Sequence, residues 1–249
     1  MKAVRSLYLK MQVTTKAIVL SSLKYGDTSL IVKAFTQSDG LKSYLLKGIL
    51  TSKKGKLKPG LFQPLTQLEI VAVHKNKGTL ESIREAKVVQ HYQTLQTDIV
   101  KNSLVLFLAE TLSIAIQEEE ENLGLFEYLT YAFYWLDTRE SNPNFHLLFL
   151  LHLTKYMGFY PETSDAEMPY FDLLEGCFLA SPTLNPMLNG IALKNFKQFL
   201  GINFDGLFSV KLNNDQRQDL LKKLLLYFEL HLQGFRMPKS LAVLNAVFH

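Results

Sequence analysis

Short runs rich in β-branched and aromatic residues recur through the first 85 positions, and turn-forming residues separate them. Such runs favour strands, whereas the Gly, Asn and Asp residues between them favour tight turns. The runs cover residues 16–20, 29–35, 41–46, 67–73 and 79–83. Because no helical spacing separates the last two runs, the pattern predicts a small five-stranded barrel, closed or partly open, such as an OB-fold.

From Val88 onward the apolar positions take the three- and four-residue spacing of amphipathic helices. The first stripe consists of Ile99, Leu104, Leu106, Phe107, Ala109, Leu112 and Ile116. Further helices are expected at residues 125–136, 143–157, 193–200, 214–233 and 241–247. The predicted fold class is therefore α+β: an OB-fold barrel at residues 11–87, followed by a mostly α-helical domain at residues 88–249 with an irregular insert near 160–190.

Three dense clusters fall on the expected helices. Four consecutive glutamates at 118–121 lack the spacing of a metal-ligand set, so we interpret them as a solvated helix end or loop after the first helix. The stretch at 145–153 is strongly apolar but too short to span a bilayer, and we expect a buried helix there. The aromatic cluster is expected to fill the core of the helical domain and contains Tyr128, Tyr131, Phe133, Tyr134 and Trp135.

Charge is distributed unevenly between the two parts of the chain. Residues 1–90 contain 16 Lys and Arg against 5 Asp and Glu, a formal +11, whereas residues 91–249 contain 11 against 18, a formal −7. Five lysines and three glycines fall within residues 47–60. A clustered cationic surface is suited to a phosphate backbone, and the glycines allow that backbone to approach closely.

Lysine supplies nearly all of this charge, since only Arg5 and Arg84 occur in the first 90 residues. Lysine lacks the planar fork with which arginine reads guanine edges, so the surface predicts nucleic-acid binding without sequence preference. The lysines expected to bind nucleic acid are Lys33, Lys42, Lys47, Lys53, Lys54, Lys56, Lys58, Lys75 and Lys77.

Four aromatic residues of this half, Tyr25, Phe35, Tyr44 and Phe62, could provide stacking surfaces for unpaired bases. Phe35 and Phe62 lie in apolar context, so we expect them in the core. Tyr44 is expected on the same face of its strand as Lys42, which makes it the better stacking candidate. We therefore add Tyr44 to the residues expected to bind nucleic acid.

Motifs for covalent chemistry are absent from the sequence. The six histidines form no pair with zinc-ligand spacing, and neither a Gly-Lys-Ser/Thr phosphate loop nor a Gly-x-Ser-x-Gly turn occurs. The single cysteine, Cys177, cannot form an internal disulfide and has apolar neighbours, which favours a packed thiol and fits the reducing cytosol. We therefore expect a cytoplasmic binding protein without a cofactor or membrane span, and not an enzyme; Met11 is a second plausible start.

Several short motifs, in their order and spacing, resemble the bacterial recombination-mediator family RecO. They are Tyr25-Gly26-Asp27, Phe35-Thr36 with Gly40, Lys47-Gly48, Leu61 to Pro64, Phe145 with Leu151, Gly158 to Pro161, and Pro238-Lys239-Ser240. The resemblance implies an N-terminal OB-fold and a helical C-terminal domain. It also implies a DNA repair and recombination accessory protein that binds single- and double-stranded DNA, anneals complementary strands, and acts with RecR to load recombinase on DNA coated by single-strand-binding protein.

The chain departs from that family at one place. Many members carry a four-cysteine zinc site in the segment that corresponds to residues 162–190, where this sequence has only Cys177. We therefore expect no zinc, and we expect apolar contacts to hold this segment through Phe171, Leu173, Leu174, Phe178 and Leu179.

The resemblance further implies a pocket for the acidic, apolar-ended tail of single-strand-binding protein. Such a pocket needs a cationic rim, and Arg139 with Lys155, which flank the apolar stretch at 145–153, are the expected residues. Lys222 and Lys223 are the second choice. Two other classes stay open from the residues alone: an RNA-binding or translation-linked OB-fold protein, and a nucleic-acid hydrolase whose carboxylates meet only in the fold.

Overall fold

A computed structural model describes residues 11–51, 56–75 and 78–248 of the chain, which form two compact units. The first unit takes its described residues from Met1–His91 and from Ile116–Phe126. The second consists of Tyr92–Ala115 and Glu127–His249. The sequence suggested a single boundary near residue 87, but in the structure Ile116–Phe126 also belongs to the first unit. This segment connects two helices, and its backbone packs against a strand of the first unit.

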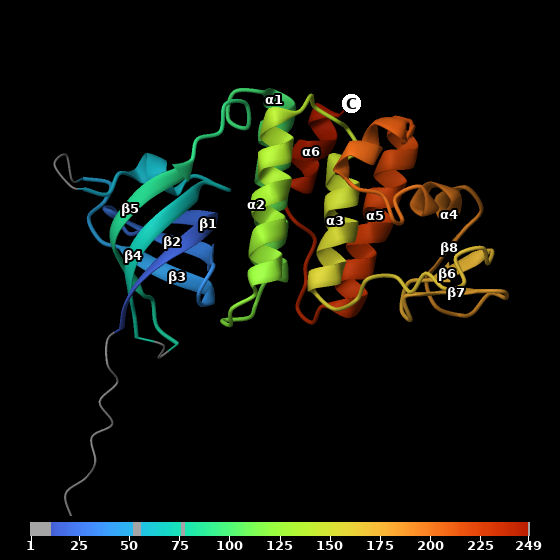
Figure 1. Ribbon diagram of the computed structural model, residues 1–249, viewed down its shortest axis with the longest axis horizontal. Coiled ribbons are helices and arrows are strands. Elements are labelled where there is room, and N and C mark those ends of the chain that lie inside the picture. The colour runs from blue at the N-terminus through green and yellow to red at the C-terminus, as the bar shows by residue number, and fades with distance from the viewer. Residues whose placement is uncertain (1–10, 52–55, 76–77, 249) are drawn as a thin grey trace, which may run out of the picture. The chain divides into compact units, whose positions relative to one another are not determined.

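Five antiparallel strands form the sheet of the first unit, in the order β3-β2-β1-β4-β5 (Figure 1). They are β1 (Met11–Tyr25), β2 (Ser29–Thr36), β3 (Gly40–Leu46), β4 (Gln67–His74) and β5 (Ser82–Gln90). β1 is much longer than the expected run at 16–20, because its first half pairs with β4 and its second half with β2. The fifth strand lies at Ser82–Gln90 and not at 79–83, since it is the later residues that pair with β4.

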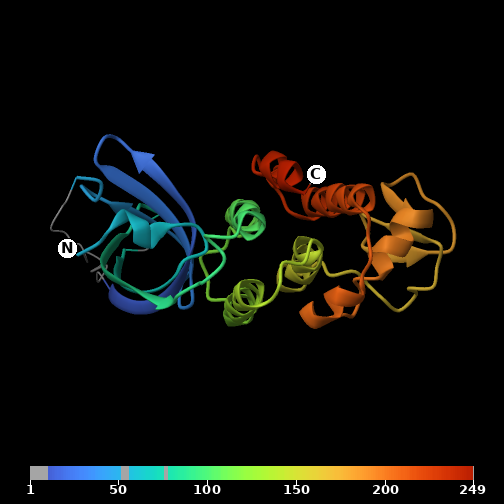
Figure 2. The ribbon, with the colours of Figure 1, turned by 90° about the horizontal axis from the view of Figure 1, so that it is seen from above.

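The sheet is strongly curved, and a bulge between Val19 and Ser21 contributes to that curvature (Figure 2). At its edge, Tyr44 of β3 forms a parallel bridge with Glu81, the residue before β5. Leu45 N donates to Glu81 O at 2.9 Å, and Glu81 N donates to Ser43 O at 2.8 Å. Among the described residues this contact is a single bridge and not a ladder. A five-stranded antiparallel sheet is thus present, as predicted, without a detected closure of the barrel.

The concave side of this sheet encloses the core of the first unit. The 3₁₀ helix η1 (Pro59–Phe62) contributes Phe62, which is 1 % exposed. The other buried members of this core are Ala17, Val19, Leu30, Val32, Ala34, Tyr44, Leu46, Ile49, Leu68, Ile70, Ala72 and Ile83. Phe35 is also 1 % exposed and lies 6.0 Å from Phe126 between ring centroids. The prediction that Phe35 and Phe62 are core residues is confirmed.

The second unit is mainly helical, as predicted, and includes most of α2. The helices are α1 (Ile99–Ala115), α2 (Leu123–Thr138), α3 (Phe145–Tyr156), α4 (Gly190–Lys197), α5 (Asn214–His231) and α6 (Leu241–Val247), with a 3₁₀ helix η2 (Phe204–Ser209). α1 ends at Ala115, so the glutamates at 118–121, expected as a solvated helix end or loop, lie in the loop that follows this helix. No helix in the described part of the chain is both long and apolar enough to cross a membrane.

The segment expected to be irregular contains a small antiparallel sheet with the order β7-β6-β8. Its strands are β6 (Tyr170–Asp172), β7 (Cys177–Leu179) and β8 (Met187–Asn189). Phe171, Leu173 and Phe178 are buried there, as predicted, but Leu174 is 41 % exposed and Leu179 is only half-buried. The prediction that Leu174 helps to hold this segment by apolar contacts is therefore wrong, because Leu174 lies in a turn that directs its side chain toward solvent.

A buried carboxylate joins the turns of this small sheet. The Asp172 side chain, which is fully buried, accepts hydrogen bonds from Leu174 N at 2.9 Å and Glu175 N at 3.1 Å. It also accepts from Thr183 Oγ1 at 2.8 Å and from Asn185 Nδ2 at 3.0 Å. One carboxylate thus connects the β6–β7 turn to the β7–β8 loop, a role that no apolar residue could fill.

Candidate nucleic-acid interface

The outer face of strands β1 to β3 carries a mixture of cationic, hydroxyl and exposed apolar side chains. Ser21, Lys33 and Ser43 lie opposite one another across the three strands, so they share this face. Ile31 of β2 pairs with Leu23 on one side and Leu45 on the other, which extends the face toward the β1–β2 turn. Lys33 is half-buried, and burial lowers the pKa of its ammonium group.

Tyr25 lies at the end of this outer face and is 56 % exposed. It follows Leu23 by two positions, so both side chains lie on the side of the strand that carries Ser21. Leu23 is 65 % exposed. The exposed aromatic residue of the face is therefore Tyr25, which the sequence analysis named but did not choose, because the strand register that puts it on the same face as Lys33 was not known.

Tyr44 points to the opposite, concave side and is completely buried. Its hydroxyl hydrogen-bonds His74 Nε2 at 2.9 Å, and burial raises the pKa of Tyr44 strongly. A ring enclosed in the core cannot stack on a nucleic-acid base, so the assignment of Tyr44 as a stacking residue is wrong. The alternation of residues along β3 correctly predicted that Tyr44 and Ser43 lie on opposite faces of the strand. It does not indicate which of the two faces belongs to the core.

Lysines of the long loop and of the β4–β5 connection lie at the surface. Lys47, Lys56 and Lys58 are exposed and Lys75 is half-buried. Lys56 Nζ contacts Glu85 Oε1 at 2.8 Å, an ion pair whose partners are 80 % and 58 % exposed, so solvent and salt compete with it readily. The expected residues Lys53, Lys54 and Lys77 lie outside the described residues.

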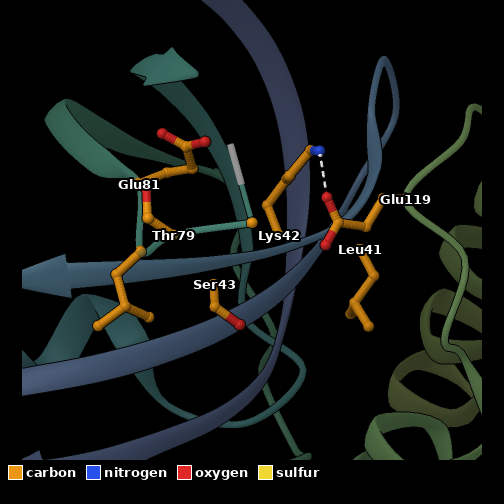
Figure 3. Close-up of a pocket in the computed structure, with 8 residues that line it drawn as sticks. Leu41, Lys42, Ser43, Thr79, Glu81 and Glu119 are labelled. Atoms are coloured by element: carbon orange, nitrogen blue, oxygen red, sulfur yellow. Dashed lines mark hydrogen bonds and ion pairs between the residues drawn. The ribbon is translucent and has the colours of Figure 1, made fainter. Parts of the chain in front are cut away.

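A pocket of about 260 Å³ opens between β3 and the chain that precedes β5 (Figure 3). Its lining residues are Leu41, Lys42, Ser43, Gly78, Thr79, Leu80, Glu81 and Glu119. Lys42 is only 5 % exposed, and its Nζ contacts Glu119 Oε2 at 2.8 Å.

Sequence reasoning identified Lys42 in this pocket but missed Ser43, Thr79, Glu81 and Glu119. Glu119 is distant in the sequence, and no local pattern indicates that it returns to β3. The carboxylate of Glu81 accepts a hydrogen bond from Lys75 N at 2.8 Å, which holds the β4–β5 connection next to the pocket. Across the described residues, no three His, Cys, Asp or Glu side chains gather as metal ligands.

The second unit carries an aromatic pocket of about 300 Å³ on α2. Its lining residues are Tyr131, Tyr134, Trp135, Thr138 and Arg139. Tyr131 and Tyr134 are 52 % and 50 % exposed, which corrects the expectation that the whole aromatic cluster is core. The other members, Tyr128, Phe133 and Trp135, are buried as predicted. The helix turns the two tyrosines away from the core while their neighbours fill it.

Arg139 lies at the rim of this pocket, 57 % exposed, with its guanidinium 3.9 Å from Asp205. Lys155 is not among the described residues that line the pocket. Its Nζ lies 4.5 Å from the ring centroid of Tyr160. The structure therefore does not bring Arg139 and Lys155 together in this pocket.

The segment around Cys177 does not fit a zinc ion. Burial raises the pKa of the Cys177 thiol, and the carboxylates of Asp172, Glu175 and Asp165 raise it further. The nearby carboxylate of Asp172 is already bonded to four donors. A single thiol that resists deprotonation and an occupied carboxylate do not form a closed tetrahedral site.

Two family descriptions match nearly the whole chain. "Recombination protein O N terminal" matches residues 11–92, and "Recombination protein O C terminal" matches residues 96–241. A DNA repair protein RecO of Christiangramia forsetii is 52% identical over 238 residues, which cover 96% of this chain and 100% of the relative. The proteins of that name from Flavobacterium psychrophilum and Bacteroides fragilis (strain ATCC 25285) are 46% and 37% identical, and cover 96% and 94% of this chain and 100% and 98% of their own length.

Proposed function

Because the chain belongs to the recombination protein O family of non-enzymatic recombination mediators, we propose that it binds single- and double-stranded DNA without sequence preference. On this proposal it anneals complementary strands and, with RecR, helps to load recombinase onto DNA coated by single-strand-binding protein. The observation that carries the proposal is the outer face of β1 to β3, which carries the exposed Tyr25 and the half-buried Lys33. Annealing follows physically, since a cationic surface that holds two strands reduces their mutual repulsion.

An OB-type barrel is the fold that we propose for this nucleic-acid-binding module. Two features of the first unit support it: the five-strand order, with β1 paired to both β2 and β4, and the parallel bridge between Tyr44 and Glu81. In this arrangement the β1–β2 turn and the β4–β5 connection border the face of β2 and β3, where OB-folds bind oligonucleotides.

Phosphates are the proposed ligands of the exposed lysines. Lys47, Lys56, Lys58 and Lys75 surround the sheet on its loops, and Lys33 lies on the outer face itself. If about five phosphates are neutralised, the logarithm of the affinity for single strands should fall with the logarithm of salt concentration at a slope near −3.5. Tyr25 replaces Tyr44 as the residue proposed to stack on a base.

The test is fluorescence anisotropy with labelled oligonucleotides of unrelated sequence at several salt concentrations. Charge reversal at Lys53, Lys54 and Lys56 should weaken binding to all sequences alike and slow annealing. The matched control is Lys194→Glu, an exposed lysine of the second unit. A triple variant that binds and anneals like the wild-type protein at moderate salt would contradict the proposal, and RNA that outcompetes DNA of the same sequence would favour the RNA-binding alternative.

The aromatic pocket on α2 is the proposed site for the tail of single-strand-binding protein. Tyr131, Tyr134 and Trp135 offer apolar surface for a terminal aromatic residue, and Arg139 offers a cation for carboxylates. A tail peptide titrated into the full chain should bind in the micromolar range, about −8 kcal/mol. Arg139→Ala should weaken this binding, whereas Lys155→Ala serves as the comparison for the other expected residue; unchanged binding in both variants would place the tail elsewhere.

A further inference from the structure

The four consecutive glutamates at 118–121, which we call the acidic strap, lie on the first unit next to β3. They belong to Ile116–Phe126, the segment that returns from the helical unit. Leu41 N at the start of β3 donates a hydrogen bond to Glu118 O at 3.0 Å. All four glutamates are exposed. The sequence predicted a solvated helix end or loop here, and the structure shows an exposed loop whose backbone lies against β3, a strand of the candidate nucleic-acid interface.

Gly40 shows that this contact is closely fitted. Its φ is +61°, a conformation that other L-residues rarely adopt. A Cβ atom at this position would meet the backbone oxygen of Glu120, and would lie 2.7 Å from Glu120 N and 2.8 Å from Glu118 O. The strap therefore approaches the start of β3 so closely that only glycine leaves room for it.

Glu119 of the acidic strap forms an ion pair with the Lys42 ammonium group. Lys42 is 5 % exposed, whereas its partner Glu119 is 61 % exposed. A charged group at that depth requires a partner, since an uncompensated buried charge is strongly unfavourable. Figure 3 shows the Glu119 carboxylate at the Lys42 ammonium group beside the pocket that both residues line. The other carboxylate in the pocket belongs to Glu81.

We propose that this pocket is a phosphate subsite of the DNA interface, and that in the free protein the Glu119 carboxylate occupies the position that a DNA phosphate takes in the complex. Carboxylate and phosphate oxygens both accept charge-assisted hydrogen bonds from an ammonium group, so one can replace the other on Lys42. The exchange is feasible because Glu119 is mostly exposed and regains water when released. The acidic strap thus acts as an internal competitor that lowers the affinity for DNA.

This inference rests on the proposed DNA binding and deepens it. It accounts for three observations together: a lysine buried at the edge of the interface, an exposed carboxylate held on it, and a glycine that seats the strap. General repulsion between the acidic strap and DNA would not explain why Glu119 is paired with Lys42. The distinguishing feature is that Glu119, and not the strap's charge in general, limits access to Lys42.

The test compares Glu119→Gln with Glu121→Gln in the full chain by fluorescence anisotropy with a labelled single-stranded oligonucleotide. Both variants remove one charge from the same strap, but the described residues show an ion pair only for Glu119. We expect Glu119→Gln to tighten binding about fivefold more than Glu121→Gln, because Glu119, the partner that must leave, is mostly exposed, and an ion pair with such a partner contributes up to about that factor. Adding Lys42→Gln to Glu119→Gln should remove the gain.

Equal affinities of the Glu119→Gln and Glu121→Gln variants would overturn the inference, and so would weaker binding by Glu119→Gln. Circular dichroism checks that each variant folds; if Lys42→Gln does not fold, the comparison of the two glutamate variants decides alone. Failure of the proposed function gives a different result, since the wild-type protein itself would then show no salt-dependent binding to DNA.

Discussion

Removal of the Asp172 carboxylate should open the small sheet of β6, β7 and β8 without unfolding the rest of the second unit. This carboxylate accepts from two backbone amides, of Leu174 and Glu175, and from the side chains of Thr183 and Asn185. Asp172→Ala removes all four interactions at once. The three strands have three residues each, so little else in their backbone pairing resists opening.

The magnitude follows from the exposure of the four donors. A hydrogen bond to a charged group contributes about 1.5 to 3 kcal/mol when its donor stays buried. Here Leu174, Glu175 and Thr183 are exposed residues, so water can reach their donors once the carboxylate is gone. We therefore take about half of the lower limit for each of the four bonds and expect a total loss of about 3 kcal/mol, which corresponds to an opening equilibrium about 100-fold more favourable.

Hydrogen–deuterium exchange followed by mass spectrometry measures this opening locally, on peptides that cover residues 170–189. Amides of that segment should exchange about 100-fold faster in Asp172→Ala, whereas amides of α3 should keep their protection. The matched control is Asp165→Ala, which removes an exposed carboxylate five residues before this segment. Equal exchange in the Asp172→Ala and Asp165→Ala variants would refute the assigned role of the buried carboxylate.

The same carboxylate predicts an acid limit for the segment. Burial acts to raise the pKa of Asp172, but the hydrogen bonds from Glu175, Thr183, Asn185 and Leu174 outweigh it and hold the pKa below the usual 3.8. A carboxylate whose pKa is lower in the folded state stabilises that state above the unfolded pKa, and this stabilisation is lost as pH falls through the folded pKa. Protection of residues 170–189 should therefore be unchanged between pH 8 and about pH 5 and decrease below about pH 4.

Three further predictions concern the strap, the aromatic residues and metal. Gly40→Ala should destabilise the first unit by about 2 kcal/mol in urea unfolding, because of its positive φ and the strap's backbone, whereas Gly60→Ala, where an added Cβ meets nothing within 4 Å, should not. Tyr44→Phe should cost about 1 kcal/mol of stability and leave the DNA affinity unchanged, whereas Tyr25→Ala should weaken single-strand binding by about 1 to 3 kcal/mol; the reverse result in anisotropy would restore the sequence-based choice. Elemental analysis should find no stoichiometric zinc and a chelator should leave the melting temperature unchanged, so one zinc per chain would contradict the description of the small sheet.

Local pattern and charge predicted much of this protein before any contact was known. The strand order along the chain, the change to helical spacing and most helix positions follow from side-chain periodicity, which is set by neighbours a few residues apart. The cationic first half and acidic second half are properties of composition, and they pointed to a phosphate-binding end. The cores around Phe35 and Phe62 also followed, since apolar context is visible in the sequence.

Only the tertiary structure decided which face of each strand and helix is exposed to water. Alternation along β3 divides its residues into two sets, but the pairing of Val32 with Tyr44 places Tyr44 in the core and leaves Ser43 outside. Helical spacing on α2 likewise could not show that Tyr131 is exposed while Trp135 is buried. Burial depends on which element covers a face, and that element is distant in the sequence.

Long-range contacts were also beyond the sequence, and they decide the candidate site. Glu119 meets Lys42 across 77 positions, and the small sheet forms around a carboxylate whose donors lie on two separate turns. Residues so far apart carry no common local signal, because their proximity results from the packing of whole elements. The sequence by itself determined the elements and the charge of this protein, and the fold determined which of those charges meet each other and which remain available to a ligand.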